Sequence, residues 1–155
     1  MNNKKEKDLV VIFKEEAIFW LDKKGNWRNE NGPFQNPKIN AHFHSSIQRD
    51  EEDCYLFQEH GEYLEKVYFP YEDTALFVSE VLLEAEPVLI LNNHERIPLV
   101  PENLFAKDDQ LYTLDKGHRI KFTENALLRI SNLMQFQDDH IFININGEKY
   151  RIYSY

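Results

Sequence analysis

One aromatic side chain and four cations are the best candidates for a binding site in this sequence. Trp27 could stack on the base of a nucleotide-like ligand, because an indole ring offers a large flat π surface. The anionic part of such a ligand could be held by Arg28, Lys66, Lys121 and Arg129. The alternative for Trp27 is a buried aromatic residue of the core. The sequence thus predicts a site for a small anionic ligand and leaves this alternative open.

No motif predicts catalysis or metal binding. His42 and His44 lie two residues apart on an expected helix, where they point about 200° apart and cannot ligate one metal ion. Cys54 falls in an expected strand and is interpreted as a structural thiol. No serine lies on a glycine elbow. We therefore expect no catalytic residue, no metal, no cofactor and no enzymatic activity.

Acidic residues cluster in four expected turns. Neighbouring acids in turns are usually solvated, and we expect this of the clusters at 50–53, 72–73, 108–109 and 138–139. The pair Glu72-Asp73 stands between an aromatic strand and a buried strand. There it could orient a backbone segment or accept hydrogen bonds from an arginine.

Composition restricts the class of protein. With 155 residues, 42% of them apolar, the chain can bury an ordinary core. Its net charge of −9 argues against DNA and anionic membranes as partners. The longest apolar runs are too short to span a membrane. The single cysteine excludes an intrachain disulfide and favours a cytoplasmic location.

Turn and capping signals indicate an α+β fold, mostly antiparallel strands with two short helices. One helix begins at the N-cap Asn36 with Pro37 and has an apolar face of Ile39, Phe43 and Ile47. The other begins at Thr123 and buries Leu127, Ile130 and Met134. Residues 1–16 are expected to be a flexible tail that leads into a first strand or short helix. The predicted core contains Phe19, Phe43, Ile47, Leu56, Val67, Phe77, Val81, Leu89, Ile130, Met134, Ile143 and Ile152.

A weak duplication divides the chain. A capped helix followed by a hairpin occurs twice, about 87 residues apart, so that Phe43 matches Ile130 and Ile47 matches Met134. The segment Glu84-Ala-Glu-Pro87 is the best boundary, which gives similar units at 17–85 and 86–155. Ligands often bind at the interface between such units.

The sequence resembles the bacterial domain-of-unknown-function family 1285 over about residues 17 to 153. The matching motifs are Gly25-Asn-Trp27, Gly32-Pro33, Phe43, the acidic turn before Tyr55-Leu56, Glu65-Lys66, Tyr71-Glu-Asp73, Asn92-Asn93, Ile97-Pro-Leu99 and Gly147.

The resemblance implies two related α+β units, the second similar to pleckstrin-homology domains. It also implies a cleft for a nucleotide-like ligand between the units and a role in signalling. The chain departs from the family pattern at Ala75, Leu76 and His94. Lys121 stands where the family tends to have arginine, so a bidentate grip on an anion is lost there.

Two functions of different classes remain. The first is a noncatalytic ligand-sensing module that binds a nucleotide-like anion between its units. The second is a protein–protein interaction module that uses strand edges or an aromatic surface. A cleft lined by Trp27 and several cations would favour the first. An exposed apolar patch or an unpaired edge strand would favour the second.

Overall fold

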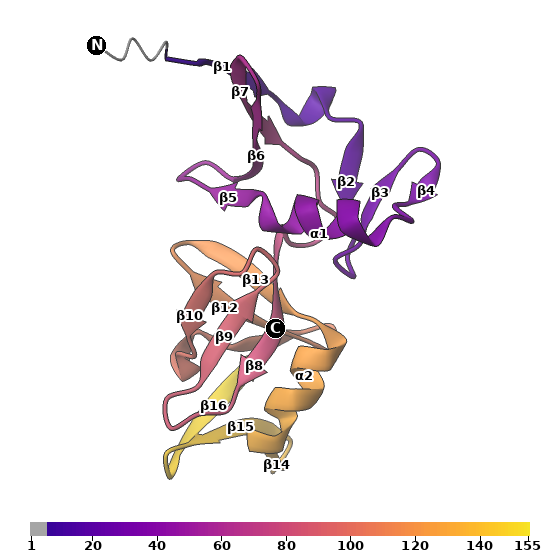
Figure 1. Ribbon diagram of the computed structural model, residues 1–155. Helices are drawn as coiled ribbons and strands as arrows, with labels where there is room; N and C mark the ends of the chain where they lie inside the picture. Colours follow the sequence, from indigo (N-terminus) through magenta and orange to yellow (C-terminus); the bar gives the residue numbers. More distant parts are fainter. Residues whose placement is uncertain (1–5) are drawn as a thin grey trace, which may run out of the picture. The chain divides into compact units, whose positions relative to one another are not determined.

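The computed structural model describes residues 6–155 and has an α+β fold with two compact units, Met1–Asp73 and Thr74–Tyr155 (Figure 1). The predicted boundary after residue 85 is therefore wrong. Strand β8 (Leu76–Leu82) pairs with β9 (Val88–Leu91) and with β13 (His118–Phe122), so the long strand assigned to the first unit belongs to the second.

The predicted N-terminal tail also needs correction. Strand β1 (Asp8–Ile12) pairs in parallel with β7 (Tyr63–Tyr68), and Lys14–Glu16 form a turn of 3-10 helix. A run of aliphatic residues has high strand propensity, and β7 supplies the hydrogen-bonding partners that it needs. Residues 1–5 of that tail lie outside the described residues.

Unit 1 contains two small sheets and one α-helix. The four-stranded sheet has the order β1-β7-β6-β5, with β6 at Cys54–His60 and β5 at Ile47–Arg49. The three-stranded sheet is formed by β2 (Phe19–Leu21), β3 (Trp27–Asn29) and β4 (Gly32–Pro33). An isolated bridge from Leu21 to Tyr71 ties β2 to the segment after β7.

Helix α1 (Pro37–Ser45) begins as predicted but ends early. The Asn36 side chain accepts from the Lys38 N–H at 2.9 Å, as an N-cap does. At the other end, the Ser46 hydroxyl donates to the carbonyl of His42 at 2.7 Å. Such a bond competes with the helical ladder, and the chain leaves the helix before Ile47, which starts β5. The predicted apolar face is thus divided between two elements, and Ile39 is exposed.

Unit 2 is a nine-stranded sheet with one α-helix, α2 (Glu124–Ile130), which packs against β8 and β13 (Figure 1). Its strand order is β10-β9-β8-β13-β12-β11-β16-β15-β14. The remaining strands are β10 (Arg96–Pro98), β11 (Phe105–Lys107), β12 (Gln110–Asp115), β14 (Met134–Gln137), β15 (His140–Ile145) and β16 (Glu148–Ser154). Turns of 3-10 helix occur at Pro101–Asn103 and Ser131–Leu133.

Each α-helix is followed by three strands that pair in order, β5-β6-β7 in unit 1 and β14-β15-β16 in unit 2. Phe43 and Ile130 lie in the two helices, whereas Ile47 and Met134 are the first residues of the strands that follow. The two segments therefore correspond locally. The prediction that Ile47 and Met134 are helical is wrong, because each begins a strand. A duplication of whole units stays a prediction, as does the likeness of unit 2 to pleckstrin-homology domains.

Most of the predicted core is buried. Nine of the twelve predicted residues are buried, and the half-buried exceptions are Phe19, Phe43 and Met134. No helix among the described residues is long and apolar enough to cross a membrane.

Candidate functional site

Trp27 is a core residue of unit 1. Its side chain is completely buried, and the rings of Phe19, Phe43 and Phe69 pack against it edge-on with centroids 4.9–5.8 Å away. The predicted stacking of a ligand base on Trp27 is therefore not available in this structure, and the alternative of a buried aromatic holds. Gly25 and Asp22 shape the tight turn that brings Trp27 back onto β2.

Two of the four predicted cations lie in unit 1, and each faces a carboxylate there. The guanidinium of Arg28 lies 3.5 Å from Asp22, and Lys66 Nζ lies 2.7 Å from Asp50 Oδ2. Lys66 also lies over the ring of Tyr55, with Nζ 4.2 Å from the centroid. Both charges thus take part in internal ion pairs.

The other two predicted cations belong to unit 2. Lys121 is half-buried on β13, opposite Tyr112 in the ladder. Arg129 is exposed in the last turn of α2. The five predicted site residues are therefore distributed over both units, three in the first and two in the second.

The acidic turn between β5 and β6 organises unit 1, a role that its sequence does not indicate. Asp50 accepts hydrogen bonds at 2.7 Å from both Lys66 and the Tyr68 hydroxyl. Asp53 lies 2.5 Å from Lys14 Nζ and accepts from the Tyr71 hydroxyl at 2.9 Å. The two ends of the turn thus bind side chains from β7, from the 3-10 turn at Lys14–Glu16 and from the segment after β7. The prediction that Asp50 and Asp53 are merely solvated is wrong, and only the family motifs around this turn pointed toward it.

The ion pair at this turn shifts both pKa values. Burial raises the pKa of the Asp50 carboxyl, but hydrogen bonds from Lys66, from Tyr68 and from the backbone of Asp53 and Glu52 outweigh it and hold that pKa well below its usual range. The hydrogen bond to Asp50 raises the pKa of Lys66 above its usual range. Both groups therefore remain charged at neutral pH.

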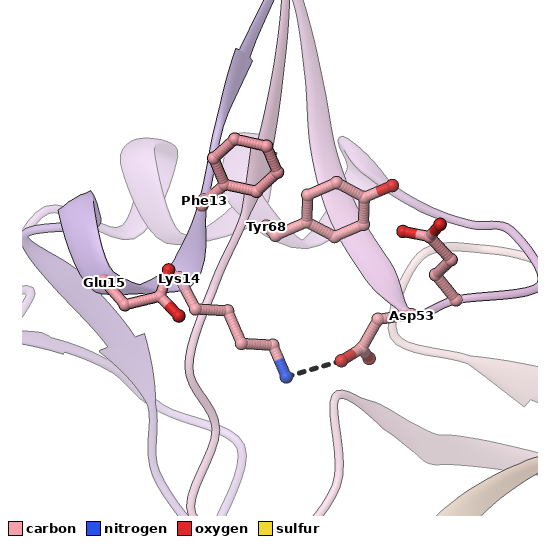
Figure 2. Close-up of a pocket in the computed structure, with 6 residues that line it drawn as sticks. Phe13, Lys14, Glu15, Asp53 and Tyr68 are labelled. Atoms are coloured by element: carbon pink, nitrogen blue, oxygen red, sulfur yellow. Dashed lines mark ion pairs between the residues drawn. The ribbon is translucent and has the colours of Figure 1, made fainter.

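A pocket of about 240 Å³ lies beside this turn, where β1 and β7 end. Figure 2 shows the rings of Phe13 and Tyr68 side by side above the ion pair of Lys14 with Asp53. The remaining lining residues are Glu15 and Glu52.

The pocket has an acidic lining. It contains three carboxylates and one ammonium group, and that ammonium belongs to Lys14, which is paired with Asp53. Within residues 6–155, the carboxylates of Glu15 and Glu52 make no hydrogen bond or ion pair. This pocket therefore favours a cationic group over the predicted nucleotide-like anion.

The edge strand that leads into the pocket exposes an apolar surface. The exposed fractions are 55% for Leu9, 42% for Val10, 37% for Val11 and 57% for Phe13. One side of β1 pairs with β7, and the other side has no strand partner among the described residues. An exposed apolar strand with an open edge is the feature expected of an interaction module.

The histidines and the cysteine do not form a reactive cluster. Cys54 is buried at the start of β6, and the ring of His44 packs 5.7 Å from that of Trp27. The described part of the chain contains no group of three or more His, Cys, Asp or Glu side chains that could hold a metal ion.

Comparison with known proteins identifies the fold. No family model and no curated protein match the sequence. The crystal structure of a DUF1285 family protein from Silicibacter pomeroyi superimposes with a TM-score of 0.58 and 14% identity, covering 95% of this chain and 83% of that chain. A DUF1285 family protein from Shewanella baltica has a TM-score of 0.51 and 16% identity, covering 77% of this chain and 94% of that chain. The chain therefore has the fold of DUF1285 family proteins, which confirms at this level the resemblance inferred from its motifs.

Proposed function

We propose that this chain is a noncatalytic protein–protein interaction module that binds an extended segment of its partner along the outer edge of β1. The observation that carries the proposal is the open edge of β1, where Leu9, Val10 and Val11 are all exposed. Backbone N–H and C=O groups along such an edge can pair with an added strand, and side chains on either face supply specificity. A cytoplasmic location and a role in signalling belong to the same proposal.

Two other sheet edges, those of β10 and β5, are better protected against an added strand, whereas the edge strand β14 (Met134–Gln137) also has no charged residue. Natural proteins protect edges with short strands, charged residues or proline. Strand β10 carries Arg96 and Pro98, and β5 is three residues long and ends in Arg49. By contrast, β1 is five residues long and carries one charged residue, Asp8, at its first position. The difference supports β1 as the docking strand.

The pocket supports the same proposal, because it lies at the end of β1. A partner strand that runs along β1 would pass Phe13 and reach Glu15 and Glu52. The rings of Phe13 and Tyr68 can contact the aliphatic stem of a long side chain, while the carboxylates pair with its charged end. A lysine or arginine of the partner fits this combination.

Site-specific crosslinking tests the proposal. We would place a photoreactive amino acid at Val10, with a control at Leu128, which is 69% exposed on α2. The expected result is a discrete crosslinked protein from position 10 that is absent from position 128, and purified forms of that protein should slow amide exchange in β1. Equal crosslinking from both positions, or binding that leaves exchange in β1 unchanged, would contradict the proposal.

A further inference from the structure

We infer that the partner segment that pairs with β1 carries two apolar residues and one arginine at alternate positions, and that the guanidinium of this arginine enters the acidic pocket. This inference rests on the proposed function, because it names the side chains that the same edge selects. The order of the three residues follows the order of Leu9, Val11 and Phe13 along the edge.

The four-stranded sheet of unit 1 has one buried face and one open face. Paired residues in a ladder point to the same side of a sheet, and side chains along a strand alternate between the two sides. The face that carries Leu56 and Val67 is buried. The opposite side is the open face, and its exposed or half-buried side chains include Leu9, Val11, Tyr55, Phe57, Leu64 and Lys66.

The open face is apolar along the edge formed by β1. A sheet with one face in water usually alternates apolar side chains on the buried side with polar ones on the other. Along β1 the open face instead presents Leu9 and Val11, both exposed, and the exposed Phe13 follows two residues later. A strand added to β1 would place every second side chain beside one of these residues. The two positions beside Leu9 and Val11 therefore select apolar side chains.

The position beside Phe13 lies next to the pocket. The rings of Phe13 and Tyr68 stand side by side there, and Glu15 and Glu52 line the pocket without any ion pair to the described residues (Figure 2). The ammonium group of the pocket is already paired with Asp53. Adjacent strands lie about 4.8 Å apart, so an added strand is about 10 Å from β7. A long, positively charged side chain is needed to span that distance and to balance the two carboxylates.

Arginine fits this position better than lysine. Its guanidinium is planar, stacks on aromatic rings and presents five N–H donors, which can reach carboxylates of two different segments at once. The lysine ammonium is a more strongly hydrated point charge and loses more on leaving water. The two rings of the pocket, together with Glu15 from the 3-10 turn and Glu52 from the turn before β6, therefore favour arginine.

A palindromic peptide tests this motif on the full chain. The probe is acetyl-Arg-Thr-Val-Thr-Val-Thr-Arg-amide, which presents two valines and an arginine at alternate positions in either strand direction. We expect it to bind and to slow amide exchange of residues 8–12. Serine in place of both valines should weaken binding, because Leu9 and Val11 would then face polar side chains. Failure of the probe to bind, or equal affinity of the serine peptide, would overturn the motif.

Citrulline peptides test the arginine. Citrulline has nearly the shape of arginine without its charge, so replacing both arginines with citrulline should weaken binding about tenfold at low ionic strength. Lysine in place of both arginines keeps the charge and should weaken binding about threefold, because the planar contact with the rings is lost. Equal affinity of the arginine and citrulline peptides would overturn the inference.

Variants of the pocket test its role as the destination of the guanidinium. Glu15→Gln combined with Glu52→Gln should abolish the preference for the arginine peptide over the citrulline peptide. The matched control combines Glu30→Gln with Glu86→Gln, which removes the same charge at two other exposed positions and should leave the preference intact. A preference that survives in the pocket variant would overturn the assignment of the pocket.

Failure of this inference is distinguishable from failure of the proposed function. A probe that slows exchange in β1 equally with arginine and with citrulline would exclude the arginine and leave the docking edge in place. The crosslink from Val10 decides the proposed function separately, because it captures a natural partner whatever residues that partner carries. Absence of both a peptide complex and a crosslinked partner would exclude both.

Discussion

Lys66 and Asp50 form an ion pair across 16 residues, with Nζ 2.7 Å from Oδ2. The contact joins β7 to the turn between β5 and β6, and the Tyr68 hydroxyl donates to the same carboxylate oxygen. Asp53 at the far end of this turn holds Lys14, next to the end of β1. The turn therefore fixes the lining of the pocket on which the proposed interaction depends.

Asp50→Asn should destabilise unit 1 by about 1–3 kcal/mol, because it leaves Lys66 and Tyr68 without their charged acceptor. Urea denaturation followed by tryptophan fluorescence measures this unit alone, since Trp20 and Trp27 are the only tryptophans and both belong to it. Glu51→Gln in the same turn is the matched control and should change stability by less than about 0.5 kcal/mol. Equal effects of the two variants would contradict the role given to Asp50.

The ion pair also predicts a dependence on pH. The pKa of Asp50 is lowered by folding, so its contribution is complete above the ordinary value of 3.8 and is lost as pH falls through the folded value. The pKa of Lys66 is raised by folding, so its contribution is complete below the ordinary value of 10.5 and is lost as pH rises further. Denaturation of wild type and Asp50→Asn from pH 7 to 2 should show the two stabilities converging in acid. A difference that stays constant would refute the assignment.

Trp27→Ala should cost unit 1 about 3–5 kcal/mol, because it leaves a cavity among Phe19, Phe43 and Phe69. Trp27→Phe should cost less, since it fills part of that space and removes an indole N–H that has no hydrogen-bond partner among the described residues. The remaining Trp20 provides the fluorescence signal. Ile18→Ala, at an exposed position, is the control and should be nearly neutral. A neutral Trp27→Ala would show that this aromatic core is assigned incorrectly.

Ile130→Ala should destabilise unit 2 by about 2–5 kcal/mol, because Ile130 is completely buried on α2. Leu128→Ala on the same helix removes an exposed side chain and should change stability by less than about 0.5 kcal/mol. Amide exchange of β8 and β13, which pack against α2, measures the loss within this unit. Similar protection of these amides in the two variants would mean that the buried face of α2 is assigned incorrectly.

The nucleotide-like ligand stays a prediction, and a thermal-shift screen with nucleotides, nucleotide second messengers and simple anions at low salt tests it. A ligand at 100 times its dissociation constant would add about 2.7 kcal/mol of stability. Our account expects no shift, because Trp27 is buried and the pocket is acidic. A shift that Lys121→Ala abolishes would instead support the ligand-sensing function.

Turn and capping residues predicted the individual helices and hairpins better than they predicted which strands pair with one another. Asn146-Gly147 predicted the last hairpin, and both residues have the positive φ angles, 52° and 79°, that such a turn requires. The N-caps Asn36 and Thr123 were predicted correctly for the same reason, since capping depends on neighbouring residues. The predicted boundary between the units was wrong because strand pairing over long sequence distances determines it. Strand β8 pairs with β13 and therefore belongs to unit 2.

The candidate site depends on contacts that a single sequence does not display. Asp50 reaches Lys66 and Tyr68 across 16 and 18 residues, and no periodic pattern links them. The basic start of the chain suggested a tail, yet its aliphatic residues pair with β7 more than 50 residues away. Arg28 and Lys66, predicted to bind a ligand, and Asp50 and Asp53, predicted to be solvated, are instead paired within unit 1.

Amide exchange along β1 tests the central claim most directly. We would compare residues 8–12 in the free and the assembled protein, with Arg96 and Ile97 of β10 as an internal reference. Our account predicts that assembly slows exchange in β1 and leaves β10 unchanged. Assembly that leaves β1 exchanging as fast as in the free chain would contradict it.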